Sequence, residues 1–185
     1  MDFQIFILEQ KNIMKKTNTI SLPGKIHFDP TDKTKKHISQ SSWKKMALIL
    51  FDGDVSEYYS WFIERRYNLK LNKPLRGAHI SFFNDSVNDL KIANPNKDIQ
   101  KLWNDLSLKW NNKIINVQLD TDVRSDGEHW WLNIPEECRK PIHDIRAEIG
   151  LGRPFFGLHM TIGTANEKNL FHSNYILNLI RIFND

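Results

Sequence analysis

GAHIS at residues 77–81 and GLHMT at residues 157–161 share one pattern: a glycine, an apolar residue, a histidine, an apolar residue and a hydroxyl residue. Further apolar residues follow the first stretch, and an isoleucine follows the second, so each stretch predicts a β-strand. In a strand, residues i and i+2 lie on the same face of the sheet. Each histidine therefore shares a face with its hydroxyl residue. One such stretch is typical of a buried structural histidine, whereas two indicate a shared polar site.

The sequence around the two stretches repeats the same order of elements: a strand, a helix, a connector with glycine, and the strand with histidine. MALILF opens the first copy and HWWLNI opens the second. The helix start and the histidine are 25 residues apart in the first copy (Asp54 to His79) and 24 in the second (Pro135 to His159). Two related units placed side by side create a cleft between like positions. The units are expected at about 44–83 and 128–164.

Hydrophobic periodicity predicts an α+β fold. Helices are expected at about 54–67, 98–110, 135–149 and 169–183, and strands at about 24–30, 44–51, 77–83, 113–120, 128–134 and 155–163. The first helix is expected to start with a capping box at Asp54 to Glu57 and to bury Tyr58, Trp61 and Phe62. The third is expected to start at Pro135, to place Cys138, Ile142, Ile145 and Ile149 on one face, and to stop at Gly150 and Gly152. Loops are expected at 31–42 and 121–127.

The chain has 185 residues, which fits one domain or one domain of two similar lobes. We expect residues 1–19 to form a poorly ordered extension and residues 20–185 to form a single domain of two lobes. The formal charge of +4 favours an anionic ligand without specifying one.

Cysteine content and apolar runs limit the cellular setting. Cys138 is the single cysteine, which excludes an intramolecular disulfide and a cysteine-based zinc cluster. The longest apolar runs, at residues 5–8 and 46–51, are far shorter than the roughly 20 residues that span a membrane. Asp2 stands where a signal peptide carries basic residues. We therefore expect a cytoplasmic protein that does not bind a membrane.

The alternation in EHWWLNI predicts which of its residues face the cleft. Trp130, Leu132 and Ile134 fall on the core side, so the opposite side carries His129, Trp131 and Asn133. Trp131 is a candidate platform on which a base stacks, with ordinary packing as the alternative. His129 is a further candidate for substrate binding.

Two arginines occupy matching places before the two histidine strands. Arg76 precedes the first stretch and Arg153 precedes the second. They are candidates for phosphate binding, and solvated loop charges are the alternative. Paired histidines also suit a metal, with His129 as a third ligand, but neither stretch carries a carboxylate at ligand spacing. We expect neither a metal nor another cofactor.

The two motifs, His79-x-Ser81 and His159-x-Thr161, resemble those of the two-histidine (2H) phosphoesterase superfamily, over roughly residues 43–165. Within it, SEYYSWFIERR and IHDIRAEIGLGRPFFGLHMTIG look most like the phage proteins that degrade the cyclic oligonucleotide signals of bacterial CBASS immunity. The resemblance implies a duplicated two-lobed fold, with antiparallel-rich sheets around a central cleft and helices on the outer faces. It also implies catalytic roles for both histidines and both hydroxyl residues. Ser81 replaces the usual threonine and keeps the hydroxyl.

Two imidazoles with a pKa near 6.5 suit acid-base cleavage of a phosphodiester, with one neutral and one cationic near neutral pH. Taken with the resemblance, this predicts a metal-independent phosphodiesterase that cleaves 3'-5' bonds of cyclic di- or trinucleotides. Such a viral anti-CBASS enzyme would act in the cytoplasm of the infected cell. The first alternative is an RNA-end phosphodiesterase acting on 2',3'-cyclic phosphates or 2'-5' linkages. The second is a non-catalytic module that binds nucleotides or RNA. We expect no DNA partner, and no oligomeric state is predicted.

Overall fold

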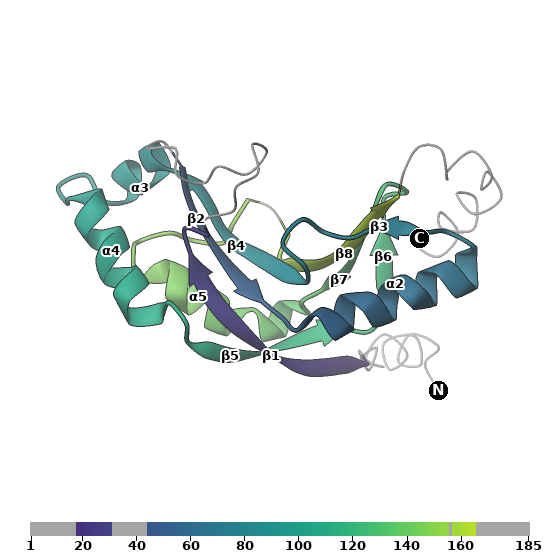
Figure 1. Cartoon of the computed structure of the whole chain (residues 1–185). Helices are drawn as coiled ribbons and strands as arrows, with labels where there is room; N and C mark the ends of the chain where they lie inside the picture. The colour runs from purple at the N-terminus through teal and green to yellow at the C-terminus, as the bar shows by residue number, and fades with distance from the viewer. Residues whose placement is uncertain (1–17, 31–43, 156, 166–185) are drawn as a thin grey trace, which may run out of the picture.

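A computed structural model describes residues 18–30, 44–155 and 157–165. This part of the chain forms one antiparallel sheet of eight strands with α-helices packed on it (Figure 1). The strands are β1 (Thr19–Phe28), β2 (Lys44–Leu50), β3 (Leu71–Asn72), β4 (His79–Ser86), β5 (Ile114–Asp120), β6 (Val123–Ser125), β7 (His129–Asn133) and β8 (His159–Ala165). The helices are α2 (Gly53–Tyr67), α3 (Val87–Ala93), α4 (Ile99–Trp110), α5 (Lys140–Ala147) and the 3-10 turn η2 (Glu136–Cys138). The predicted α+β class is confirmed.

The two histidine strands are neighbours in the middle of the sheet. The strand order is β5-β1-β2-β4-β8-β7-β6, and β3 pairs with β8 outside this path. The first predicted unit therefore contributes β2 and β4 to one side of the centre, and the second contributes β8 and β7 to the other. Figure 1 shows β4 and β8 meeting above α2 and α5. The order of strands thus brings the two motifs to one place.

The core lies on the face of the sheet that the helices cover. Ile80 and Phe82 of β4 are fully buried there, together with Met160 and Ile162 of β8. Tyr59 and Ile63 of α2 and Ile142 and Ile145 of α5 belong to the same hydrophobic cluster. His79, Ser81, His159 and Thr161 alternate with these apolar residues and are half-buried. The predicted alternation is confirmed, and we call the face that carries these four polar residues the histidine face.

Both histidine strands contain a β-bulge one residue after the hydroxyl residue. Ala47 pairs with Phe83 and Leu48 with Ser81, so Phe82 is an extra residue of β4. In the same way Ile162 is an extra residue of β8. A bulge reverses the alternation after it, so Phe83 and Gly163 also face the core, where both are buried. The bulges occupy the same place in both copies of the motif.

Helix α2 departs from the prediction at its start and in its buried face. Its N-cap is Asp52, whose side chain makes no capping hydrogen bond, so the predicted capping box at Asp54 is wrong. Tyr58 and Trp61 are 58% and 55% exposed, so the prediction that they are buried is also wrong. The buried residues are Ser56, Tyr59 and Ile63. Tyr59 and Ile63 lie four apart, and this pair sets which side of the helix packs on the sheet.

Several other elements differ from the expectations. Helix α3 was not predicted, although Ser86 and Asp89 form a complete capping box at its start. The expected loop at 121–127 contains β6, and β1 begins at Thr19, earlier than predicted. The expected helix from Pro135 divides at Arg139, which is the C-cap of η2 and the N-cap of α5, and another proline, Pro141, lies in the first turn of α5. Gly150 ends this region with a φ of 74°, a left-handed conformation that glycine tolerates.

Ile142, Ile145 and Ile149 are buried as predicted, whereas Cys138 is only half-buried. No helix in the described ranges has the length and apolar character needed to cross a membrane. The expected extension at 1–19, apart from its last two residues, lies outside the described part of the chain. The expected loop at 31–42 and the expected helix at 169–183 lie wholly outside it.

Candidate active site

Side chains from both units meet on the histidine face. His79 of β4 pairs directly with Thr161 of β8, and Thr161 pairs in turn with Trp131 of β7. Cross-strand partners lie on the same face with Cβ atoms about 4.5–5.5 Å apart. The histidine of the first motif therefore stands beside the hydroxyl residue of the second.

Ser81 and His159 lie two residues further along the same two strands, beyond the one pair that joins β4 to β8. Because the strands are antiparallel, Ser81 follows His79 in the direction in which His159 precedes Thr161. Asn133 of β7 is the partner of His159 on its other side, and Leu48 of β2 is the partner of Ser81. Two imidazoles and two hydroxyls thus form a compact group on neighbouring strands.

A glycine carbonyl fixes the orientation of each imidazole. Nδ1 of His79 lies 2.9 Å from the carbonyl oxygen of Gly77, and Nδ1 of His159 lies 2.8 Å from that of Gly157. A carbonyl only accepts hydrogen bonds, so Nδ1 of each ring carries the proton and donates it. Nε2 is then the nitrogen of each ring that can exchange a proton with a ligand. Gly77 adopts a φ of 69°, which presents its carbonyl at this angle without strain.

Burial lowers the pKa of His159 below its usual value near 6.5, and the hydrogen bond to Gly157 opposes this effect. The nearby His129 lowers the pKa further. The charged form of an imidazole loses hydration when it is buried, so the neutral form is favoured. His159 is therefore neutral near pH 7 and able to accept a proton at Nε2.

Trp131 lies between the two motifs and the far edge of the sheet. Its ring centroid is 5.8 Å from that of His159, and its Nε1 donates to Oδ1 of Asn133 at 3.0 Å. It is half-buried on the histidine face, as the alternation predicts. An indole held in this way beside the catalytic candidates can stack on a base.

The other predicted binding residues differ in their surroundings. His129 is exposed on the histidine face, and its Nδ1 lies 3.2 Å from Asp126. Arg76 is half-buried, and its Nη1 contacts the sulfur of Met46 at 2.9 Å. Arg153 is exposed and forms an ion pair with Glu136 at 2.6 Å. The two arginines therefore occupy unlike environments despite their matching places in the sequence.

Further charged residues on the histidine face escaped the sequence analysis. Arg124 of β6 is the cross-strand partner of Trp131. On the other side of the site, Lys25 and His27 of β1 pair with residues of β2 that neighbour β4. Burial, and then Lys25, lowers the pKa of His27. The alternation of Val123, Arg124 and Ser125 was the available signal, but three residues are too few for a strand pattern to stand out.

Arg146 of α5 holds the first motif's strand from the core side. It is 2% exposed and forms a bidentate ion pair with Asp85, with distances of 2.8 and 3.0 Å. Nη1 also donates to the carbonyl of Phe82 at 2.6 Å, and Nε donates to that of Gly152 at 2.8 Å. Phe82 is the bulge residue next to Ser81. Arg146 thus ties the second unit to the bulge that positions the first motif.

The described part of the chain offers no set of side chains that could ligate a metal ion. No three His, Cys, Asp or Glu side chains there are grouped so that they could hold a metal ion.

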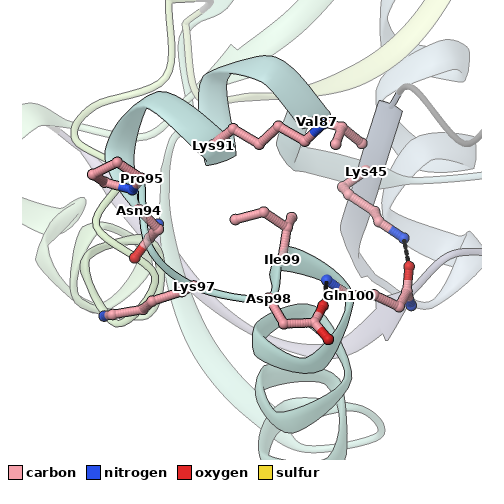
Figure 2. A pocket seen from close by; sticks show the side chains of 9 residues that line it. All are labelled: Lys45, Val87, Lys91, Asn94, Pro95, Lys97, Asp98, Ile99 and Gln100. Atoms are coloured by element: carbon pink, nitrogen blue, oxygen red, sulfur yellow. Dashed lines mark hydrogen bonds between the residues drawn. The ribbon is translucent and has the colours of Figure 1, made fainter.

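Figure 2 shows a separate pocket of about 470 Å³ between β2, α3 and the start of α4. Three lysines line it, Lys45, Lys91 and Lys97, but no predicted site residue does. Lys45 donates to Gln100 at 3.0 Å, and Asp98 caps α4 by accepting from two backbone N–H groups. Because none of the predicted site residues lines this pocket, the histidine face remains the candidate site.

Comparison with known proteins yields no relative: no family model, curated protein or solved structure matches the chain significantly.

Proposed function

We propose that the chain is a metal-independent phosphodiesterase that cleaves 3'-5' bonds of cyclic di- or trinucleotides by acid-base catalysis with two histidines. The observation that carries the proposal is the group of His79, Ser81, His159 and Thr161 on β4 and β8. Each histidine donates from Nδ1 to a glycine carbonyl, and His79 is the direct cross-strand partner of Thr161 from the other motif.

The chemistry needs one group that accepts a proton and one that donates a proton. The neutral imidazole removes the proton of a ribose 2'-hydroxyl, and the 2'-oxygen attacks the adjacent phosphorus. The bond from phosphorus to the 5'-oxygen breaks, and the other imidazole, protonated, gives its proton to that oxygen. The product is a linear oligonucleotide that ends in a 2',3'-cyclic phosphate. The lowered pKa of His159 favours it as the base, with His79 as the acid.

The hydroxyls of Ser81 and Thr161 suit the stabilisation of charge on the phosphate. Negative charge collects on the non-bridging oxygens as the 2'-oxygen attacks, and hydroxyl groups that point at those oxygens stabilise it. Thr161 is the cross-strand partner of His79, and Ser81 lies on the same face, two residues after His79, so both hydroxyls share the face that carries the two rings. Both halves of the chain would therefore contribute to one active site.

The proposed biological substrates are the cyclic oligonucleotide signals of bacterial immunity, which would make this a viral anti-CBASS enzyme. The resemblance of the motifs and of the helix end around Arg146 supports this choice, and the basic residues on the histidine face suit a ligand with more than one phosphate. An RNA-end phosphodiesterase would use the same four residues on a different substrate.

The test is a substrate panel in the presence of EDTA. The purified full-length chain is incubated with cyclic di- and trinucleotides, 2',3'-cyclic AMP and a 2'-5'-linked dinucleotide, and the products are separated by ion-exchange chromatography. We expect linear products with 2',3'-cyclic phosphate ends from the cyclic oligonucleotides. No cleavage, or cleavage only after a metal is added, would contradict the proposal.

Variants of the two histidines test the assigned chemistry. His79→Ala and His159→Ala should each reduce turnover on the order of a hundredfold or more, as the loss of a general acid or base does. His143→Gln is the matched control, because His143 lies on α5, away from the histidine face. Equal activity of all three variants would exclude the assigned roles.

A further inference from the structure

Arg124 ends a row of side chains that crosses the sheet through the proposed active site. It pairs with Trp131, Trp131 pairs with Thr161, and Thr161 pairs with His79. Its neighbour Val123 packs against the core, so Arg124 lies on the histidine face. At a spacing of about 4.8 Å per strand, the Cα atoms of Arg124 and Thr161 are roughly 10 Å apart.

Arg124 is half-buried but has no partner in the described part of the chain. Its Nε is buried without a hydrogen-bond acceptor, and no hydrogen bond or ion pair joins its guanidinium to a described residue. Arg146 differs in this respect, because its buried guanidinium binds the carboxylate of Asp85 and the carbonyl oxygens of Phe82 and Gly152. A buried donor without an acceptor is unfavourable, and it persists where a ligand supplies the acceptor.

We propose that Arg124 binds a second, non-scissile phosphate of the substrate, while Trp131 stacks on the base that lies between the two phosphates. The planar guanidinium suits a phosphate, which accepts two of its N–H groups at once. Along the row, the guanidinium of Arg124 comes first, the indole of Trp131 second, and the catalytic residues last. A nucleotide chain presents a phosphate, a base and the scissile phosphate in the same order. The identity of the ligand rests on the proposed function.

This assignment defines a substrate class. A ligand that fills both ends of the row carries at least two phosphodiesters, as a cyclic dinucleotide does. A nucleoside 2',3'-cyclic phosphate or a dinucleoside monophosphate reaches only the catalytic end. The site should therefore prefer cyclic oligonucleotides by affinity, through a contact that takes no part in the chemistry.

The test measures binding separately from turnover. In the full-length His79→Ala background, which does not consume the ligand, calorimetry gives the Kd of cyclic di-AMP, cyclic di-GMP and cyclic GMP–AMP. The tightest ligand is then compared with adenylyl-3'-5'-adenosine, which has a single phosphate. Adding Arg124→Gln should weaken the cyclic dinucleotide about tenfold to a hundredfold, as loss of a charge-assisted contact does, and should weaken the single-phosphate ligand far less.

Salt dependence separates a phosphate contact from a structural role. Removing one phosphate contact should reduce the slope of log Kd against log salt by about 0.7, the value for single strands. Arg124→Lys should keep that slope, because it keeps the charge, and still bind more weakly because it lacks the planar fork. Arg65→Gln, an exposed arginine on α2, is the matched control and should change neither quantity. Thermal unfolding of each variant checks that the fold is intact.

Two results would overturn the inference. One is an unchanged affinity of Arg124→Gln for the cyclic dinucleotide. The other is an equal loss for both ligands, which would place Arg124 on the scissile phosphate. If the wild-type chain binds cyclic dinucleotides without cleaving them, the proposed function fails while the contact to Arg124 is still measured. If none of the three cyclic ligands binds, the inference fails as well.

Discussion

His79 and Thr161 are direct cross-strand partners, although one belongs to the first motif and the other to the second. Only this pair of residues joins β4 to β8 in the ladder. The two halves of the described sheet therefore meet at the residues to which we assign the chemistry. A substitution at this junction should affect turnover more than folding.

Thr161→Val should reduce kcat about a hundredfold to a thousandfold, as loss of one donor to the developing negative charge does. Valine has nearly the shape of threonine, so packing is preserved while the hydroxyl is lost. Thr161→Ser is the matched control, since Ser81 shows that the first motif uses serine, and it should retain most of the activity. Cleavage of a cyclic dinucleotide in EDTA is the measurement. Equal rates for the two variants would show that the hydroxyl has no role.

The stability of the protein should decrease as the pH falls through and below about 6.5. Burial lowers the pKa of His159 in the folded state, so the unfolded chain binds more protons in this range. Burial lowers the pKa of His27 and of His143 in the same direction. Urea unfolding between about pH 7.5 and pH 5 measures the free energy of unfolding, and His159→Gln should show a weaker pH dependence. A free energy that rises toward acid pH would contradict this.

Replacing His129 should move the titration of His159. His129 lowers the pKa of His159, so His129→Gln should raise that pKa toward the ordinary value. The ring-proton signal of His159 in NMR spectra recorded across the pH range gives the midpoint directly. The acid side of the pH–rate profile should shift to higher pH by the same amount if His159 is the base. If the NMR midpoint of His159 shifts while the pH–rate profile does not, the base is another group.

Gly77→Ala should lower the free energy of unfolding by about 1–2 kcal/mol, because an L-residue is strained at a positive φ. The backbone of Gly77 has a φ of 69°, while no atom lies within 4 Å of the position of an added Cβ, so the effect is conformational. Gly53→Ala, at the first residue of α2 and equally open, is the control and should be neutral or slightly stabilising. Turnover should also fall, because the carbonyl of Gly77 orients His79. A loss of stability in both variants would point to another cause.

Arg146→Met should destabilise the protein by about 3–5 kcal/mol, because it leaves the carboxylate of Asp85 buried without its partner. The double variant Arg146→Met with Asp85→Leu should recover part of that loss. Lys140→Met breaks the exposed pair with Asp144 and should change stability by at most about 1 kcal/mol. Denaturant unfolding measures all three. If the double variant is as unstable as the single one, the bonds to the carbonyls of Phe82 and Gly152 are the larger contribution.

The sequence predicted the two faces of the central strands more closely than the framework around them. The alternation of polar and apolar residues in β4, β7 and β8 is a local property of a strand, so it could be predicted without knowledge of the fold. Helix α2 was predicted as a helix, but its buried face was not, since Tyr58 and Trp61 have the same apolar character as Tyr59 and Ile63. Which of them is buried depends on where the helix meets the sheet. The strand β6 was missed because its three residues carry little periodicity.

The sequence by itself determined that two histidines and two hydroxyl residues occupy equivalent places in equivalent strands, on the face opposite the apolar residues. Tertiary structure alone decided that β4 lies next to β8, that Thr161 stands beside His79, and that Arg124 joins the same row. Alternation along a strand follows from its backbone geometry, whereas the neighbours of a strand depend on pairing between segments far apart in the chain. The same difference explains why Arg146, which bonds the bulge of β4 from α5, had no signal in its own neighbourhood.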